Sequence, residues 1–256
     1  MEIPGKILRR MGYLRDQEGI MNRYLSERGN WNEHLNYTKD FIAQSFTKQE
    51  IESVAILGSG WLLDVPIEKL ITRFKHIYLV DIRHPRQIRR KFAALDRVEL
   101  VEADLTGGAI EQVWEIGRKR DGRRAKDLTD MLQLKAPLTG ISPDAYVSVN
   151  LLNQLDIIPT DFLRLRGWFR DESPDAFRSL LQSFHLEWIL QKPGCLVSDI
   201  SELCKGKDGK GSTTPLLYTT LPEGFRFRRW NWEFDTRGTY RHGFQTRMEV
   251  NAVEWA

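Results

Sequence analysis

Cysteine is scarce in this sequence, which holds only two in 256 residues, Cys195 and Cys204. Two cysteines give neither the density of a disulfide-stapled fold nor the spacing of a metal site. Long apolar runs are lacking as well. None could span a bilayer, and no apolar core of a secretion signal follows the first basic residues. These absences predict a cytoplasmic protein with no metal and no membrane-spanning segment.

An excess of charge of one sign is also missing. The 38 Lys and Arg nearly balance the 35 Asp and Glu, and a net charge of +3 is too small to indicate nucleic-acid binding. A basic run at residues 117–126 favours a solvated surface turn, with a phosphate-facing patch as the alternative. Tryptophan is abundant, with 8 residues, which fits an aromatic-lined pocket as well as a filled core.

The stretch 54–66 organises the rest of the chain. Residues 54–57 are apolar and predict a buried strand, and Gly58 and Gly60 follow at once with one small residue between them. Such a pair allows positive φ angles and leaves the backbone free of side chains, so a ligand can lie against it. Pro66 suits the first turn of a following helix. Strand, glycine turn and helix in this order indicate nucleotide binding, and a plain turn is the alternative.

Polar side chains follow three further predicted strands. These strands lie at residues 76–81, 98–101 and 145–149. Asp81 ends the first of them, about 20 residues beyond the glycines, where dinucleotide-type folds place an acid that accepts hydrogen bonds from ribose. A cap on the next turn is the alternative for Asp81. Asp104 and Asn150 follow the other two strands. Since parallel strands end at one edge of a sheet, we expect all three residues to lie there.

The remaining pattern completes the predicted fold class. A fifth strand is expected at 195–200, a surface loop at 206–214, and an antiparallel pair at 230–234 and 245–255. The sequence therefore predicts an α/β fold, with a Rossmann-like, mostly parallel, doubly wound sheet, a C-terminal antiparallel hairpin and an N-terminal helical extension.

Residues 1–50 are expected to form this helical extension, and 51–256 the Rossmann-like domain. Trp31, His34, Leu35 and Thr38 follow a helical spacing. One interpretation is a helical layer packed on the sheet. The other is a lid over the ligand, with Trp31 and His34 reaching inward. One helix face could do both.

The arrangement of glycine turn and strand ends resembles the class I S-adenosylmethionine-dependent methyltransferases, from about Val54 to the C-terminus. The KPG turn at 192–194 and the antiparallel tail are also similar to that family. The resemblance implies S-adenosylmethionine as the cofactor and assigns its parts by motif position. The methionyl part would face Gly58, Ser59 and Gly60, the ribose Asp81 with Ile82, the adenine Asp104 with Leu105, and the transferring methyl Asn150.

Two departures from that family keep alternatives open. Leu62 stands where a third glycine is frequent, and Ile56 where an acid is frequent, so a non-catalytic, methyltransferase-like binding module is one alternative. An NAD(P)-dependent oxidoreductase is the other. Its diphosphate needs a helix N-terminus close behind the glycines, whereas this chain has bulky residues there and then Asp64, whose charge would repel it.

The methyl acceptor stays open. Direct in-line transfer gains most from orientation of the reacting groups, so no catalytic residue is assigned. His34, His242 and Asp199 are candidate bases if the acceptor is a hydroxyl. The run that nucleobase amino methylators carry after strand four is missing, which leaves a small molecule, a lipid headgroup or a protein side chain. Residues 1–50 and 240–244 are expected to shape the acceptor pocket.

Overall fold

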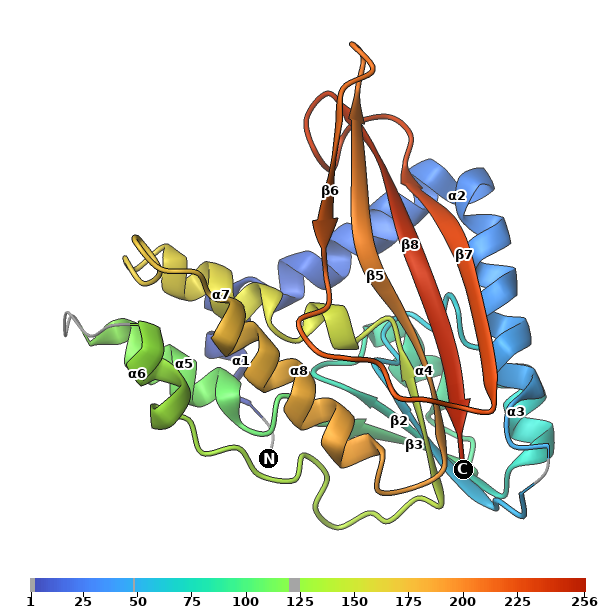
Figure 1. Cartoon of the computed structure of the whole chain (residues 1–256). Coiled ribbons are helices and arrows are strands. Elements are labelled where there is room, and N and C mark those ends of the chain that lie inside the picture. The colour runs from blue at the N-terminus through green and yellow to red at the C-terminus, as the bar shows by residue number, and fades with distance from the viewer. Residues whose placement is uncertain (1–2, 48, 120–124) are drawn as a thin grey trace.

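The computed structural model describes residues 3–47, 49–119 and 125–256, and it shows one eight-stranded sheet with helices on both faces (Figure 1). The strand order is β3-β2-β1-β4-β5-β8-β7, and β6 pairs with β5 off this path. The pairs from β3 to β5 are parallel, whereas β6, β8 and β7 join antiparallel. The predicted α/β class with an antiparallel C-terminal pair is confirmed.

The strands are β1 (Ser53–Leu57), β2 (His76–Asp81), β3 (Val98–Glu102), β4 (Ala145–Val149), β5 (Gly194–Gly206), β6 (Gly211–Pro215), β7 (Arg226–Asp235) and β8 (Phe244–Trp255). The helices of the described residues are α1 (Gly5–Met11), α2 (Tyr13–Gln44), α3 (Ile67–Arg73), α4 (Arg86–Phe92), α5 (Ala109–Arg118), α6 (Ala125–Met131), α7 (Ile157–Arg164) and α8 (Asp175–Ile189), with a 3-10 turn at Leu152–Gln154.

Each central strand buries both of its faces, which is why its sequence is a continuous apolar run. On β1, Val54 and Ile56 pack in one core cluster with α2, α3 and α4. Ala55 and Leu57 belong to a second cluster with the C-terminal half of α8. The alternation follows from the two-residue period of a strand. A third cluster joins α1, α5 and the start of α8 on that second side.

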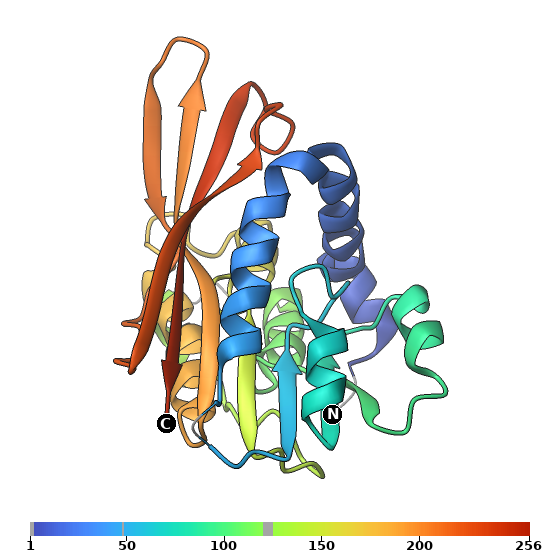
Figure 2. The same cartoon turned by 90° about the vertical axis from the view of Figure 1, so that its right-hand side faces the viewer.

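The long helix α2 is the main feature of the N-terminal segment. Figure 2 shows that α2 bends near its midpoint into two legs, which lie on different parts of the molecule. Gly29 lies close to this midpoint, and glycine is a common cause of helix kinks. The bend allows the second leg to pack against β7 while the first leg crosses toward the parallel strands.

Residues 206–214 are not the surface loop that the composition predicts. β5 continues to Gly206, a short turn follows, and β6 returns antiparallel to it, with Lys205 opposite Gly211. Every residue of β6 is exposed, so its pairing depends on backbone hydrogen bonds and leaves no apolar pattern in the sequence. The basic run at 117–126 begins in the last turn of α5 and ends at the start of α6, and its residues 120–124 lie outside the described residues.

Gly194 at the start of β5 generates a stability prediction. A Cβ there would lie 2.3 Å from Trp255 Cζ2 and 2.9 Å from the carbonyl oxygen of Tyr146. Gly194→Ala should therefore overpack the core and lower the free energy of unfolding by about 1–3 kcal/mol. Gly19→Ala on α2 is the matched control, because nothing lies within 4 Å of its Cβ position. It should stabilise the helix by roughly 0.5–1 kcal/mol. Urea unfolding of both variants measures the contrast, and equal effects would contradict it.

Candidate functional site

A cavity of about 300 Å³ lies at the carboxyl edge of the parallel strands. The strand order reverses between β1 and β4, and open α/β sheets bind ligands beside such a reversal. The cavity has the size of a small-molecule site. All eight residues that the sequence assigns to a cofactor line it: Gly58, Ser59, Gly60, Asp81, Ile82, Asp104, Leu105 and Asn150.

The glycine loop after β1 adopts backbone conformations that favour glycine. Gly58 has a φ of +78°, and a Cβ there would lie 2.9 Å from the carbonyl oxygen of Val149 on the neighbouring strand. Gly60 has a φ of +42°. Leu62, which stands in place of a third glycine, also has a left-handed φ, of 57°. The loop therefore keeps a glycine-like course at Leu62, at the energetic cost that a left-handed side chain imposes.

Asp81 at the end of β2 faces this loop. Its Oδ2 accepts a hydrogen bond of 2.7 Å from the backbone N–H of Gly60, and its Oδ1 accepts one of 3.4 Å from the N–H of Arg83. Burial raises the pKa of Asp81, and the Gly60 N–H partly offsets the rise. Each carboxylate oxygen offers about two acceptor positions, so these contacts leave Asp81 acceptor capacity for a ligand.

Asp104 after β3 is more fully engaged. Its Oδ1 accepts from the backbone N–H and the hydroxyl of Thr106, and its Oδ2 accepts from the N–H of Ile110 at 3.3 Å. The carboxylate thus caps the start of α5, where the helix leaves N–H groups unpaired. Burial raises the pKa of Asp104. Asp104 nevertheless lines the cavity.

Asn150 after β4 connects several parts of the site. Its φ of 46° is left-handed, a conformation that asparagine tolerates better than most residues. Its side-chain N–H donates to Oδ2 of Asp64 at 2.6 Å, and its backbone N–H donates to the carbonyl of Val197 at 2.8 Å. Its buried Oδ1 has no hydrogen-bond partner among the described residues.

Carboxylates dominate the charged residues of the lining. Six of them face the cavity: Asp16, Asp64, Asp81, Asp104, Asp199 and Glu202. Among the described residues that line the cavity, Arg23 is the single Lys or Arg. Sequence reasoning missed Glu202 as a lining residue because residues three apart on a regular strand point to opposite faces. A bulge between Asp199 and Ser201 shifts the register of β5 against β8, and both Asp199 and Glu202 face the cavity.

Glu202 and Asp199 differ in how far hydrogen bonds and a neighbouring positive charge compensate their burial. Glu202 accepts two hydrogen bonds from the guanidinium of Arg241, at 2.5 and 3.0 Å. Burial raises the pKa of Glu202, but the hydrogen bonds and charge of Arg241 outweigh burial and lower it. Within the part of the chain that the structure describes, Asp199 accepts only one long hydrogen bond, of 3.4 Å, from Asn153, and its Oδ1 has no partner. Burial, and then the negative charges of Asp64 and Glu202, raise the pKa of Asp199 to about 7.

The structure separates the three candidate bases. His34 lies in the lining, but its Nδ1 accepts from the indole N–H of Trp230 at 3.1 Å. Because an indole N–H can only donate, that lone pair is occupied, and burial lowers the pKa of His34 to about 3. His34 is therefore a poor proton acceptor at neutral pH. His242 is exposed and lies outside the lining, whereas Asp199 is buried within it.

The first leg of α2 forms a roof over the cavity. The carbonyl of Gln17 accepts a hydrogen bond of 2.8 Å from the indole N–H of Trp61 in the glycine loop. The side chain of Gln17 donates to the carbonyl of Arg83 beyond β2 at 2.7 Å. The second leg packs on β7, so α2 is both a layer on the sheet and a cover of the cavity. Trp31 serves the layer, because its ring packs against Trp232 on β7.

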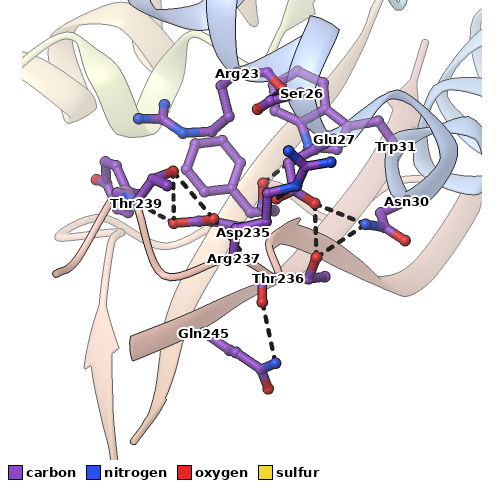
Figure 3. A network of polar contacts seen from close by, with 12 residues as sticks. Arg23, Ser26, Glu27, Asn30, Trp31, Asp235, Thr236, Arg237, Thr239 and Gln245 are labelled. Atoms are coloured by element: carbon purple, nitrogen blue, oxygen red, sulfur yellow. Dashed lines mark hydrogen bonds and ion pairs between the residues drawn. The ribbon is translucent and has the colours of Figure 1, made fainter. Parts of the chain in front are cut away.

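A polar network joins the midpoint of α2 to the loop between β7 and β8 (Figure 3). The carboxylate of Glu27 accepts hydrogen bonds from Asn30 at 2.7 Å and Thr236 at 2.9 Å. Asp235 accepts from the backbone N–H of Arg237 at 3.1 Å and from the hydroxyl of Thr239, which fixes the loop.

Beside this network, Arg23 connects the first leg of α2 to two aromatic rings from the C-terminal part of the chain. Its guanidinium carbon lies 4.8 Å from the ring centre of Phe234 and 4.7 Å from that of Tyr240. All three residues also line the cavity. The loop from 240 to 244 thus contributes Tyr240 to the lining, whereas the prediction that this loop shapes an acceptor pocket stays a prediction.

Two findings bear on other site types. Within residues 3–47, 49–119 and 125–256, no helix combines the length and apolar character needed to cross a membrane. Over the same described ranges, no group of three His, Cys, Asp or Glu side chains is placed to hold a metal ion.

The sequence matches no family model and no curated protein. Solved structures give likenesses of low identity. The complex of DhpI with SAM and HEP is 11% identical, with a TM-score of 0.35, and the match covers 96% of this chain and 99% of that chain. The precorrin-6y C5,15-methyltransferase from Geobacter metallireducens GS-15 is 12% identical, with a TM-score of 0.33 and 88% of each chain covered. Likenesses with TM-scores this low say nothing about chemistry. The chemistry of this chain is therefore inferred from its own residues and their geometry.

The raised pKa of Asp199 generates a prediction about stability. An unfolded Asp has a pKa of about 3.9, so between roughly pH 4 and 7 the unfolded state releases a proton that the folded state keeps. The free energy of unfolding therefore falls as pH rises through this range. Asp199→Asn is neutral at every pH. It should be more stable than the unmodified protein at pH 8, by on the order of 2 kcal/mol, and the difference should vanish toward pH 4.

Urea unfolding at pH 4.5 and pH 8 measures both proteins. Asp16→Asn is the matched control, since burial raises the pKa of this more exposed carboxylate as well, but the charges of Arg23 and Arg15 oppose the rise. Its difference from the unmodified protein should change in the same direction between the two pH values, but by less than that of Asp199→Asn. An Asp199→Asn variant that is less stable than the unmodified protein at pH 8 would contradict the raised pKa.

Proposed function

We propose that this chain is an S-adenosylmethionine-dependent methyltransferase that transfers the methyl group directly, in line, to its acceptor. The observation that carries the proposal is the acid-lined cavity at the strand reversal, with a glycine loop on one side and Asp81 opposite it. The family resemblance of the sequence supports the same assignment.

Charge favours this cofactor over a dinucleotide. Six carboxylates face the cavity and Arg23 is the single Lys or Arg among its described lining residues, so the potential inside favours a cation. S-adenosylmethionine carries a sulfonium and an ammonium group. A diphosphate would meet repulsion instead, in particular from Asp64 behind the glycine loop. The geometry thus disfavours an NAD(P)-dependent oxidoreductase.

The residues of the site suit the parts of this cofactor. Asp81 lines the cavity as an acceptor-only group, which suits the hydroxyls of a ribose. Asp104 lies in the lining beside the apolar side chains of Ile82 and Leu105, which suit an adenine ring and its amino group. We assign the methionyl part to the loop of Gly58, Ser59 and Gly60 and the reacting methyl to the vicinity of Asn150.

One departure from the family pattern, Leu62, has a backbone conformation that fits the proposal. Leu62 adopts the left-handed conformation that a glycine would adopt in its place. The cavity also contains buried polar atoms without partners, on Asn150, Asp199 and Tyr13, which a bound ligand could satisfy. Both observations fit a site that still binds, and they favour the enzyme over a non-catalytic module.

The cofactor supplies an activated methyl group when bound. The chain itself contributes position: the roof of α2 excludes water, and the strand ends fix the groups that orient the reactants. Orientation of this kind can contribute roughly 7–11 kcal/mol to a bimolecular reaction. No general base is needed where the acceptor is already nucleophilic.

Binding of S-adenosylhomocysteine tests the proposal. At about 100 times its Kd it should stabilise the protein by about 2.7 kcal/mol, which raises the Tm by roughly 5–10 °C. Asp81→Ala removes the proposed ribose acceptor and should abolish most of this rise. Differential scanning fluorimetry measures both. An unmodified protein whose Tm does not respond to S-adenosylhomocysteine would reject the proposed function.

Asp144→Ala is the matched control. Asp144 also holds a strand, because its Oδ2 accepts from the N–H and the hydroxyl of Ser53, both at 2.8 Å, but it does so at the opposite edge of the sheet. This variant should lose stability and keep the full ligand-induced rise. Loss of the rise in both variants would mean that Asp81 acts through stability and not through contact.

A further inference from the structure

Asp199 is the least compensated carboxylate of the cavity. Its side chain lies on β5, 4% exposed, and faces the cavity with an Oδ1 that has no hydrogen-bond partner. The charges that act on it are those of Asp64 and Glu202, both negative. A buried carboxylate that is neither paired nor fully hydrogen-bonded is costly, and such a group points to a ligand that completes it.

The polar groups around Asp199 include further hydrogen-bond acceptors. Asp64 lies near enough to act on its charge, and burial raises the pKa of Asp64 as well, against smaller opposing effects of Asn150 and Lys39. The Oδ1 of Asn150 is buried without a partner. Glu202 is already satisfied by Arg241. The open acceptor atoms are therefore those of Asp199 and Asn150, which suits a ligand with several N–H donors.

The position of this cluster is next to the proposed reaction centre. β4 and β5 are parallel neighbours, and the N–H of Asn150 donates to the carbonyl of Val197, two residues before Asp199. The side chain of Asn150 in turn donates to Asp64. Asp199 thus stands on the strand beside the one that ends at Asn150, to which the methyl group is assigned.

We propose that the methyl acceptor is an organic amine and that the open acceptor atoms of Asp199 and Asn150 bind its ammonium group next to Asp64. This inference rests on the proposed function and names its substrate class. An ammonium group offers three N–H donors and a positive charge, which match the open acceptor atoms. A carboxylate or phosphate acceptor would be repelled, and an alcohol would leave the negative charge uncompensated.

The chemistry balances without any further reactant. The ammonium gives one proton to the Asp199 carboxylate, which frees the lone pair of the nitrogen. That lone pair forms the new N–CH3 bond while the S–CH3 bond breaks and its electron pair passes to sulfur. The positive charge moves from sulfur to the methylated ammonium, and the proton on Asp199 leaves to solvent. The raised proton affinity of Asp199 suits this acceptance better than an ordinary carboxylate would.

Three probes that share a ring and differ in their polar end test the inference: phenethylamine, 2-phenylethanol and 3-phenylpropionate. Isothermal titration at pH 8 measures each probe on the protein with and without saturating S-adenosylhomocysteine. We expect phenethylamine to bind at least tenfold more tightly than the alcohol, and the carboxylate to bind most weakly. In Asp199→Asn, the ratio of the Kd of 2-phenylethanol to the Kd of phenethylamine should fall at least fivefold. The Kd of S-adenosylhomocysteine should change by less than twofold.

Asp16→Asn is the matched control, because it makes the same change on the roof of the cavity and should keep the preference. Equal binding of amine and alcohol, tighter binding of the carboxylate, or an unchanged preference in Asp199→Asn would each overturn the inference. If S-adenosylhomocysteine does not bind but the protein alone prefers the amine through Asp199, the ammonium site stands and the proposed function fails. If it binds and the preference is missing, only the amine assignment fails.

Discussion

The packing of α2 against β7 is the contact on which the site depends. The ring of His34 stacks on Trp232 with their centres 3.9 Å apart, and the indole N–H of Trp31 donates to the carbonyl of Phe234 at 2.9 Å. Large aromatic surfaces of this kind contribute strongly to burial. The contact fixes the second leg of α2 on the sheet, and the bend then places the first leg over the strand ends. Without this contact, the strand ends would still line the cavity, but the first leg of α2 would not cover it.

The cavity contains features that oppose stability. Leu62 and Asn150 hold left-handed backbone conformations, and Asp199 holds a buried carboxylate without full compensation. Elsewhere the chain satisfies comparable groups: buried Glu254 accepts from the N–H of Phe46 at 2.7 Å and from Arg226 at 2.6 Å. Left-handed backbone also occurs away from the cavity, at Phe46 and Phe169. The uncompensated charge of Asp199, however, lies where a ligand could relieve it, as is common at functional sites.

Local patterns in the sequence were enough to predict the framework. Four apolar residues before Gly58 predict β1, and a polar residue after each buried run predicts which side chains share an edge. Asp81 and Asn150 could be placed at the cavity in this way because strand direction alone decides it. The antiparallel pair β7–β8 was likewise visible, from aromatic residues in alternation.

The rest depends on contacts that a local pattern does not contain. The bulge that brings Asp199 and Glu202 to one cavity is a property of the pairing between β5 and β8. The hairpin of β5 and β6 is held by backbone groups, so its residues carry no apolar signal. The direction of the Asp104 carboxylate toward the start of α5, and the bend that makes α2 both layer and roof, arise only when distant segments meet.

The distance along the chain between the partners of the α2–β7 contact has a consequence during synthesis. His34 and Trp230 are 196 residues apart. At ribosomal rates of roughly 5–20 residues per second, the helix waits about 10–40 s for its strand. Through that interval Trp31 and Phe41 lack much of the surface that later covers them. A nascent or truncated chain thus displays an aromatic stripe that chaperones can recognise, and the cavity gains its cover only when β7 has been made.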